Sequence, residues 1–430
     1  MFERILITDG MVVDPSRKLE AVRDVLIEGG KIADIAPGLS RRKAVAGTLT
    51  IDAKGLWVVP GLVDMHVHLR EPGRESEETL ATGTMAAAGG GVTTVLAMAN
   101  TQPVTDSPSK ISDLRAKAKK DSLIEVLFAG AVTVGQKGKR LTDFAKLRAA
   151  GAAALSDDGR PVMDAGLFRL ALERARKLGL LVIDHCEDLT LSAGGCMNES
   201  PASRRKRVKG VPCAAETVQV LRDIGLSELT GARVHLAHLS AEASIEAVRQ
   251  AKKRGVPVTA EACPHHIALS DEMIPGRDGN WKMNPPLRSR ADREALLEGL
   301  ADGTIDAIAT DHAPHGEGPK SRGLERAPFG VIGLETSLAV VLTELFHKKI
   351  LSRRQIVERM STTPAVLLGL KDRGTLARGA RADVALIDPN ASWTPQPPYL
   401  SLSSNSPFSG RRLKGRVVKT LFAGRIVHAL

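Results

Sequence analysis

Aromatic side chains are scarce in this chain of 430 residues, where Phe, Trp and Tyr make up only 3%. Proteins that bind nucleic acid commonly stack bases on aromatic rings, so this scarcity argues against nucleic-acid binding. The formal charge of +11 would suit an acidic partner, but the basic residues are spread along the sequence and do not gather in one patch. We interpret the charge mainly as a source of solubility, with a preference for small anionic ligands.

Long apolar runs and paired cysteines are also missing. No hydrophobic stretch reaches the roughly 20 residues that a membrane-spanning helix needs, which argues against a membrane protein. The four cysteines form no CxxC pair, and the N-terminal MFERILITDG lacks the pattern of a signal peptide. These absences lead us to expect a protein of the reducing cytoplasm.

The sequence does contain a long alternation of strand and helix patterns. Short apolar segments rich in β-branched residues predict eight buried strands. They cover residues 57–68, 91–100, 124–132, 152–159, 179–187, 232–240, 257–265 and 305–315. Between them, segments such as AGLFRLALERARKLG and SIEAVRQAKKRG have the apolar spacing of amphipathic helices. Eight strands, each followed by a helix, predict an α/β fold of the (β/α)8 or TIM-barrel type.

The two ends of the chain have a different pattern. Pieces such as RILITDGMVVDP and GRVVKTLFAGRIVHAL combine β-rich runs with glycine-containing turns, which is typical of short paired strands. Neither end can close a core alone, so we expect both to pair as one small β-sandwich domain. The predicted divisions are 1–55 and 373–430 for the two parts of this β-domain and 56–372 for the barrel.

Histidines and aspartates stand at the predicted ends of five strands, and barrels of this type carry their active sites at the C-terminal ends of the strands. In GLVDMHVHLREPG, Asp64, His66, His68 and Arg70 occupy alternate positions, so an extended strand would point all four side chains the same way. The other strand ends supply Asp157, Asp158, His185, His238, Asp311, His312 and His315. Imidazoles and carboxylates are ligands of zinc and similar ions, so the set predicts a binuclear hydrolytic centre.

A single buried histidine is usually a hydrogen-bonded core residue and not a metal ligand. His235 is expected to be one, because its odd spacing from His238 puts the two on opposite faces of a strand. For His185 or His238 taken alone, the core interpretation would also be favoured. The conjunction of an HxH pair, two single histidines and an aspartate at five strand ends favours the metal centre.

Two of these segments, DMHVHLREP and ATDHAPHGEGPK, closely resemble the signature segments of dihydroorotases, which belong to the amidohydrolase superfamily. MANTQPVTD, SDDG, HCED, KMNPPLR and PFGVIGLET resemble the same family in the same order, over nearly the whole chain. The resemblance implies a zinc-dependent cyclic amidohydrolase. Such an enzyme would reversibly hydrolyse (S)-dihydroorotate to N-carbamoyl-L-aspartate in de novo pyrimidine (UMP) biosynthesis.

By the same resemblance, His66 and His68 bind the more buried metal ion, and His185 and His238 bind the other. Asp311 binds the first ion and is the catalytic proton shuttle. A metal-bound water loses its proton near neutral pH, so a hydroxide that bridges the ions would attack the amide carbonyl. Asp311 would take a proton and pass it to the departing ring nitrogen. The implied cofactor is Zn²⁺, with one or two ions per subunit and two favoured.

The bridge between the two ions follows a less common pattern. Many relatives use a carboxylated lysine, but SDDG at 156–159 contains none, so an aspartate is expected to bridge, as in one branch of bacterial dihydroorotases. We assign the bridge to Asp157 and keep Asp158 as the alternative, since one residue of strand register decides between them.

The substrate carboxylate needs a counter-charge, and Arg70 offers a planar guanidinium suited to a bidentate pair. Resemblance adds Asn100, Asn284 and His315 as substrate contacts, with backbone groups near Phe329 and Gly330. Asn100 and Asn284 could instead cap loops, and only their place in the family pattern favours binding. A further hypothesis is that HGEGPKSRG, residues 315–323, forms a mobile loop over the site.

Two other functions stay open. Hydantoinases and allantoinases are related cyclic amidohydrolases, but they generally carry the bridging lysine that this sequence lacks. A non-catalytic scaffold of aspartate transcarbamoylase would have lost metal ligands, whereas this chain retains His66, His68, His185, His238 and Asp311. The partners considered are the substrate pair, a homodimer and aspartate transcarbamoylase, with no nucleic acid and no membrane.

Overall fold

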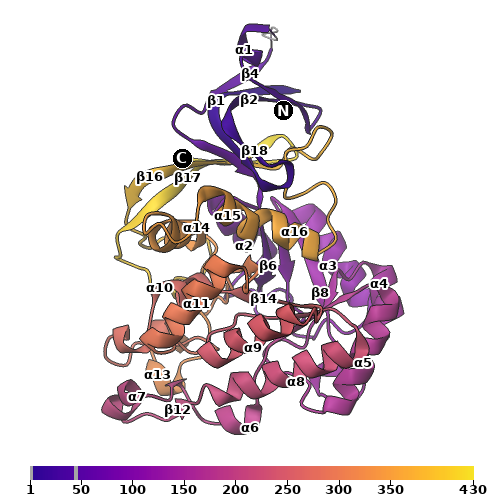
Figure 1. Ribbon diagram of the computed structural model, residues 1–430, viewed down its shortest axis with the longest axis vertical. Coiled ribbons are helices and arrows are strands. Elements are labelled where there is room, and N and C mark those ends of the chain that lie inside the picture. The colour runs from indigo at the N-terminus through magenta and orange to yellow at the C-terminus, as the bar shows by residue number, and fades with distance from the viewer. Residues whose placement is uncertain (1–2, 43–46) are drawn as a thin grey trace.

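A computed structural model describes residues 3–42 and 47–430, and at its centre eight short parallel strands form a barrel surrounded by helices (Figure 1). The strands follow one another in chain order around the sheet. They are β6 (Leu62–Val67), β7 (Val92–Ala97), β8 (Glu125–Gly130), β9 (Ala154–Leu155), β10 (Leu181–Asp184), β13 (Val234–Leu236), β14 (Val258–Ala262) and β15 (Ala307–Ile308). A parallel bridge from Val67 to His312 closes the ring. Each strand lies inside a predicted segment, so the (β/α)8 barrel is confirmed.

Helices connect the strands around the outside of the barrel. The larger ones are α2 (Leu80–Gly89), α3 (Pro108–Asp121), α4 (Phe144–Ala150), α5 (Ala165–Leu178), α8 (Ala214–Thr230), α9 (Glu242–Lys253) and α11 (Arg290–Asp302). In α5 the Asp164 carboxylate accepts a hydrogen bond from the Leu167 amide, and the helix ends at Gly179 with φ of 65°. Within the part of the chain that the structure describes, no helix is long and apolar enough to cross a membrane.

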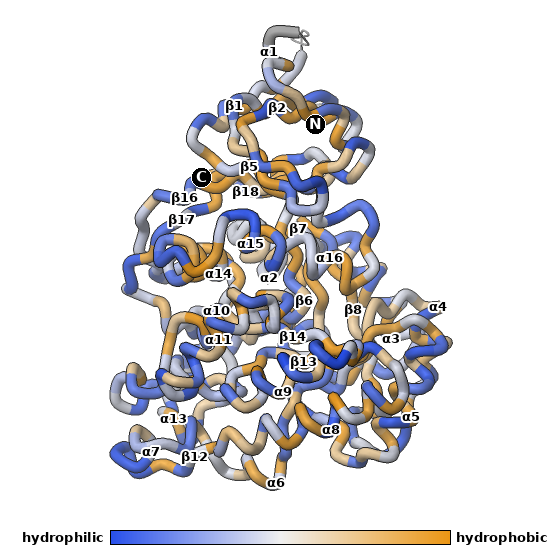
Figure 2. The backbone as a smooth tube through the Cα atoms, viewed as in Figure 1, coloured by the Kyte–Doolittle hydropathy of each residue, from blue (hydrophilic) through white to orange (hydrophobic). Residues whose placement is uncertain are grey.

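Shorter elements fill the loops and the C-terminal end of the barrel. The short helices are α1 (Leu39–Arg42), α6 (Leu189–Ser192), α7 (Pro201–Lys206), α10 (Pro264–Ala268), α12 (Glu317–Lys320), α13 (Gly323–Arg326), α14 (Ser337–Val341), α15 (Arg353–Val357) and α16 (Thr363–Leu367). Two small strands, β11 (Met197–Asn198) and β12 (Gly210–Val211), pair in parallel. Figure 2 shows hydrophobic residues along the central strands and hydrophilic ones at α7, so apolar side chains gather inside the barrel wall.

The second sheet is built from both ends of the chain. Its members are β1 (Arg4–Asp14), β2 (Leu19–Glu28), β3 (Lys31–Ala36), β4 (Leu49–Asp52), β5 (Trp57–Pro60), β16 (Val384–Trp393), β17 (Leu413–Phe422) and β18 (Arg425–Ala429). The connection runs through β5, which pairs in parallel with β1 and antiparallel with β16. Side chains from both ends bury a common core, which confirms a small β-domain assembled from the two termini.

One strand of this sheet differs from the sequence-based division. The prediction joined 57–68 into a single barrel strand, whereas Trp57–Pro60 belongs to the terminal sheet and only Leu62–Val67 to the barrel. The backbone leaves one sheet and enters the other at Gly61, where a Cβ would lie 2.2 Å from Thr93 Oγ1. We propose that the first domain boundary falls after Pro60 and not at residue 55.

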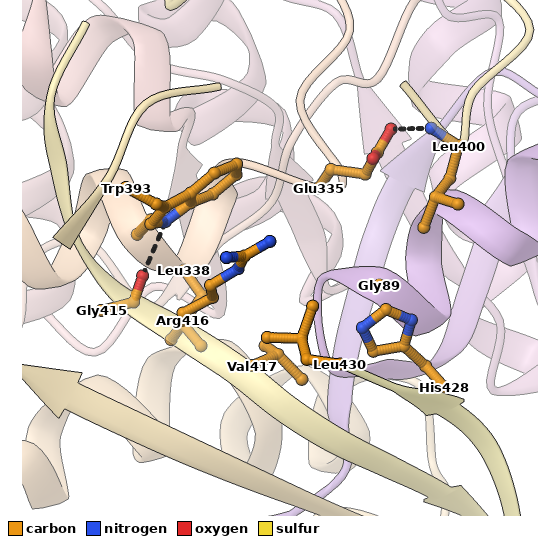
Figure 3. A pocket seen from close by; sticks show the side chains of 11 residues that line it. Gly89, Glu335, Leu338, Trp393, Leu400, Gly415, Arg416, Val417, His428 and Leu430 are labelled. Atoms are coloured by element: carbon orange, nitrogen blue, oxygen red, sulfur yellow. Dashed lines mark hydrogen bonds between the residues drawn. The ribbon is translucent and has the colours of Figure 1, made fainter. Parts of the chain in front are cut away.

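The terminal sheet packs on the barrel around a cavity of about 210 Å³ (Figure 3). Strand β17 contributes Gly415 and Val417 to its lining, and β18 contributes His428. Trp393 Nε1 donates a hydrogen bond to Gly415 O at 3.0 Å. Among the described residues, those that line this cavity include none of the predicted metal ligands or substrate contacts.

Candidate active site

The histidines predicted at the strand ends meet at the C-terminal mouth of the barrel. His66 lies near the end of β6, His68 directly follows that strand, His185 follows β10 and His238 comes shortly after β13. Because the strands are parallel, their C-terminal ends present these side chains to one space. All four imidazoles are buried, none more than 6% exposed.

Asp158 occupies the middle of this histidine group. Its Oδ1 lies 3.3 Å from His66 Nε2, 3.4 Å from His185 Nδ1 and 3.7 Å from His238 Nε2. Its Oδ2 lies 3.4 Å from His68 Nε2. One carboxylate thus faces all four imidazoles, which is the position that a bridging ligand requires.

Asp157, the residue assigned to the bridge from the sequence, points elsewhere. Its Oδ1 accepts hydrogen bonds from the backbone amides of Val132 and Thr133 at 2.8 and 3.1 Å, and its Oδ2 accepts one from the Thr133 hydroxyl. Strand β9 ends at Leu155, before either aspartate. The alternation of side chains in a strand therefore does not predict which of the two aspartates faces the histidines. Because Asp158 and not Asp157 faces the histidines, we propose Asp158, the alternative kept from the sequence, as the bridging residue.

Asp311 reaches the same centre from the last strand. Its Oδ1 lies 2.9 Å from His68 Nε2 and 3.8 Å from His66 Nε2. The backbone of Asp311 has φ of 48° and that of His238 has φ of 36°, both in the left-handed region that non-glycine residues rarely adopt. Strained backbone of this kind is held where the surrounding structure requires it, and it is frequent at functional sites.

Hydrogen bonds on the far side of each ring decide which nitrogen faces the centre. Glu261 Oε1 lies 2.8 Å from His66 Nδ1, Asn100 Oδ1 lies 2.9 Å from His68 Nδ1 and Glu187 Oε2 lies 3.0 Å from His185 Nε2. These oxygens can only accept, so each ring nitrogen beside them carries the proton. The opposite nitrogens face Asp158, and each would offer a lone pair to a metal ion once it has lost its own proton.

Glu261 is a functional residue that the sequence analysis missed. It lies on β14 with no measurable exposure, and its second oxygen is 3.1 Å from His235 Nε2. His235 in turn contacts Thr259 Oγ1 at 2.8 Å through Nδ1, in keeping with its expected core role. The sequence did contain a sign of this role, because a glutamate stands inside the otherwise apolar strand VTAEA. Charged residues are rarely buried without a partner.

At His66 and His185 burial lowers the pKa, but the contacts with Asp158 and neighbouring glutamates outweigh it and raise the pKa of both rings. Burial raises the pKa of Asp311, but the hydrogen bond with His68 and the charge of His66 outweigh burial and bring the pKa to about 2. Burial also acts on Asp158, where the charge of His66 and bonds with His185 hold the pKa well below its ordinary value. At Asp157 burial prevails and raises the pKa to about 6. The cluster is therefore built to place anionic oxygens beside a cation.

The donor set fits divalent metal ions. Among the described residues, none forms a hydrogen bond with the buried His66 Nε2, although Asp158 Oδ1 lies 3.3 Å away, and a buried nitrogen without such a bond is costly. His66, His68 and Asp311 bring ligand atoms within 4.8 Å of one another, and so do His66, Asp158 and His238. Imidazole nitrogen with carboxylate oxygen is the ligand chemistry of zinc and related ions.

A cavity of about 190 Å³ opens onto this cluster. The predicted substrate contacts Arg70, Asn100, Asn284, Phe329 and Gly330 line it together with five of the candidate metal ligands. Asn100 also joins the two groups, because its Nδ2 donates to Asp158 Oδ2 at 3.1 Å. The structure thus brings the predicted binding residues to one small polar space beside the candidate ligands.

Arg70 is fixed before any ligand arrives. Its Nε donates to Pro314 O at 3.0 Å, and its Nη2 lies 3.2 Å from His315 Nε2. His315 does not line the cavity but stands behind Arg70, where its Nε2 donates to Phe329 O at 2.7 Å. Burial and then the charge of Arg74 lower the pKa of Arg70 to about 10, which leaves the guanidinium charged at neutral pH. An anionic group of a small molecule would find its counter-charge here.

Asp64, the first residue of the alternating row, supports the strand ends. Its Oδ1 accepts hydrogen bonds from the backbone amides of His66 at 3.1 Å and Thr310 at 3.2 Å, which joins the first strand to the end of the last one. His266, near the same mouth, has its Nε2 2.9 Å from Pro285 O, next to Asn284. Asp64 and His266 thus both contact backbone groups at or next to residues of the site.

Comparison with protein families identifies two matching profiles. One, described as dihydro-orotase-like, matches residues 55–244, and one described as an amidohydrolase family matches residues 264–428. Among curated proteins, a dihydroorotase of Geotalea daltonii is 48% identical over 425 residues, which cover 99% of each chain. A dihydroorotase of Pelotomaculum thermopropionicum is 50% identical over 425 residues, or 99% of this chain and 98% of the relative.

Comparison with solved structures finds the same architecture in more distant proteins. The L-hydantoinase (dihydropyrimidinase) of Arthrobacter aurescens superposes with a TM-score of 0.88 at 26% identity, covering 100% of this chain and 96% of the other. A D-hydantoinase (dihydropyrimidinase) of a Thermus species gives a TM-score of 0.84, also at 26% identity, with 99% and 96% coverage. The full-length sequence matches are thus far closer in identity than these structural ones.

Proposed function

The chain belongs to the dihydroorotase family, and from this premise we infer that it interconverts (S)-dihydroorotate and N-carbamoyl-L-aspartate in pyrimidine biosynthesis. Full-length relatives of 48% and 50% identity carry the name dihydroorotase, which supports this activity. The observation that carries the inference is the polar cavity where Arg70 and a buried histidine and aspartate cluster face the same space. A cyclic amide with a carboxylate substituent fits this cavity, because its amide would lie at the cluster and its carboxylate at Arg70.

We propose that the cluster holds divalent metal ions, with zinc as the native metal and two ions per subunit. The proposed ligands are His66, His68, Asp158, His185, His238 and Asp311. Bound metal would lower the pKa of a coordinated water and polarise the amide carbonyl. The protein's part is to hold the imidazoles in the right tautomers, through Glu261, Asn100 and Glu187.

Asp311 is the residue that we propose to carry the proton. Its low pKa makes it a base at neutral pH, and one of its oxygens is held by His68. We assign the proton to the other oxygen, from which it passes to the ring nitrogen when the ring opens. In ring closure the same carboxylate works in the reverse direction, so one group serves both steps.

Substrate is proposed to bind through its carboxylate at Arg70, which has a planar pair of donors for it. Asn100 and Asn284, with backbone groups near Phe329 and Gly330, would contact the remaining polar atoms of the ring. His315 has a supporting role in this proposal, because it contacts Arg70 and Phe329 and does not line the cavity.

The hydantoinase alternative has less support. The hydantoinase structures are 26% identical to this chain, and SDDG offers no lysine for the bridge that such enzymes generally use. A scaffold without activity is also less well supported, since all six proposed ligands meet in one buried group. We further propose a cytoplasmic enzyme and treat a homodimer and a complex with aspartate transcarbamoylase as hypotheses that sizing chromatography of the mixed proteins would test.

The activity is tested by supplying purified, zinc-loaded protein with dihydroorotate, hydantoin and allantoin at alkaline pH. We expect loss of dihydroorotate absorbance and no turnover of the other two rings. Comparable turnover of hydantoin would favour the alternative. No turnover of any ring, even with aspartate transcarbamoylase added, would contradict the proposed function.

A further inference from the structure

Lys320, at the end of α12, has one of the largest fully buried side chains of the chain, with 2% exposure. Lysine is rarely buried unless its charge is paired. Among the ion pairs within the described ranges, none involves Lys320. The charged groups that act on it are Lys282, Asp278 and Arg70, of which two are cations. A buried ammonium in such surroundings needs another explanation.

Three backbone carbonyls hold the ammonium instead. Lys320 Nζ donates to the carbonyl oxygens of Lys282 at 3.1 Å, Pro328 at 3.1 Å and Gly330 at 2.8 Å. An ammonium has three N–H groups, so these three acceptors use all of its donors. The side chain is therefore a fixed connection between two separate segments of backbone.

These two segments form one wall of the substrate cavity. The first leads from Lys282 to Asn284, and the second contains Phe329 and Gly330. Of these residues, Asn284, Phe329 and Gly330 line the cavity. The Gly330 amide also donates to Lys282 O at 3.0 Å, so the segments are joined directly as well. Asn405 Nδ2 shares Gly330 O with Lys320, at 3.1 Å.

The wall depends on an unusual conformation. Gly330 has φ of +125°, and a Cβ there would lie 2.6 Å from Ala313 Cβ. Backbone of this kind is readily adopted only by glycine and has many other conformations available unless contacts select one. The hydrogen bond from Lys320 to Gly330 O, at 2.8 Å, is one of the contacts that select it.

We propose that Lys320 is a positioning residue for substrate: its ammonium holds the Phe329–Gly330 backbone against the segment that carries Asn284. The proposal rests on the proposed function, because it assigns a role in binding dihydroorotate. Lys320 belongs to the segment 315–323, for which the sequence suggested a mobile loop. In this proposal its buried side chain is instead a fixed part of the site.

The same contacts make substrate binding depend on pH. Burial, followed by the charge of Lys282, lowers the pKa of Lys320 to about 7, while Asp278 opposes the shift. A neutral amine has two N–H donors and a lone pair, so one carbonyl loses its donor and faces that lone pair. As pH rises through this range, the wall loosens and the KM for dihydroorotate increases.

The test compares Lys320→Met and Lys320→Arg with the wild-type enzyme, using dihydroorotate from about pH 6 to about pH 9. Methionine keeps the apolar stem without donors, and arginine keeps a charge that does not titrate in this range. The matched control is Lys348→Met, since Lys348 is exposed and pairs with Glu344 far from the cavity. Circular dichroism and melting temperature report whether each variant folds.

At pH 6 we expect Lys320→Met to raise KM about tenfold and to change kcat less than about threefold. Wild-type KM should rise with pH, whereas KM of both Lys320 variants should not follow that rise. A folded Lys320→Met variant with wild-type KM, or one that retains the pH profile of wild-type KM, would overturn the proposal. If Lys320→Met does not fold, the KM profile of Lys320→Arg decides in the same way. Inactive wild-type protein would instead count against the proposed function alone.

Discussion

At the scale of single residues, the site depends on the group behind each ligand as much as on the ligand itself. The HxH pair could be predicted from the sequence, because the alternation of His66 and His68 follows from strand geometry alone. Glu261 could not be predicted as their support, because its contact with His66 joins strands that are 195 residues apart. The choice between Asp157 and Asp158 was also beyond the sequence, since the end of β9 decides it.

Replacing Glu261 by glutamine tests this view of the supporting groups. The amide has one acceptor oxygen for His66 Nδ1 or His235 Nε2, and its NH2 group would face the other ring. We expect zinc affinity to fall about 10- to 100-fold, measured by competition with a chelator. Glu335→Gln is the control, because Glu335 is a carboxylate at the cavity of Figure 3. Unchanged zinc affinity in Glu261→Gln would contradict the supporting role.

At the scale of elements, short strands deliver the ligands and longer helices hold those strands in place. The helix at AGLFRLALERARKLG was predicted from its apolar spacing, and α5 lies within that segment, with Asp164 as its N-cap and Gly179 at its end. The run WVVPGLVDMHVH was read as one strand because its apolar residues are continuous. The change of sheet at Gly61 is a tertiary event, set by pairing of β5 with β1 and β16, which local pattern does not contain.

The N-terminal cap of α5 gives a prediction for this scale. Asp164→Ala removes the acceptor of the Leu167 amide and should lower the free energy of unfolding by about 1 kcal/mol. Turnover of dihydroorotate at 25 °C should stay at the wild-type value, because Asp164 does not line the cavity. Denaturant unfolding of the zinc-loaded protein measures the change, with Glu173→Ala, at a partly exposed position of the same helix, as control. A loss of turnover without a loss of stability would contradict this division of roles.

At the scale of the whole molecule, charge state, metal binding and folding are linked. Burial lowers the pKa of His185, but hydrogen bonds with Asp158 and Glu187 outweigh it and raise the pKa to about 10. In metal-free protein this interaction stabilises the fold fully below the unfolded pKa of about 6.5 and is lost as pH rises through about 10. An imidazole must be neutral to bind a metal ion, so metal and proton compete for the same ring.

Zinc uptake by metal-free protein should therefore release protons. At pH 8 we expect at least about one proton per chain, from His185, and a smaller release as pH rises toward 10. An indicator dye in weak buffer measures the release, and a parallel addition of zinc to buffer alone is the control. Chelator should lower the melting temperature, since metal that binds the folded state stabilises it. Zinc uptake at pH 8 without proton release would contradict the charge states described for the cluster.

We propose that one buried cluster, with Asp158 in its middle, binds the metal and hydrolyses dihydroorotate. Measuring zinc content and dihydroorotate turnover together in the matched variants Asp158→Asn and Asp157→Asn tests this directly. We expect Asp158→Asn to lose bound zinc and about 10³-fold or more in turnover, as expected for a ligand that contacts the reacting groups. Asp157→Asn should keep its zinc and most of its turnover. The opposite pattern, or full activity in Asp158→Asn, would show that Asp158 is not a metal ligand.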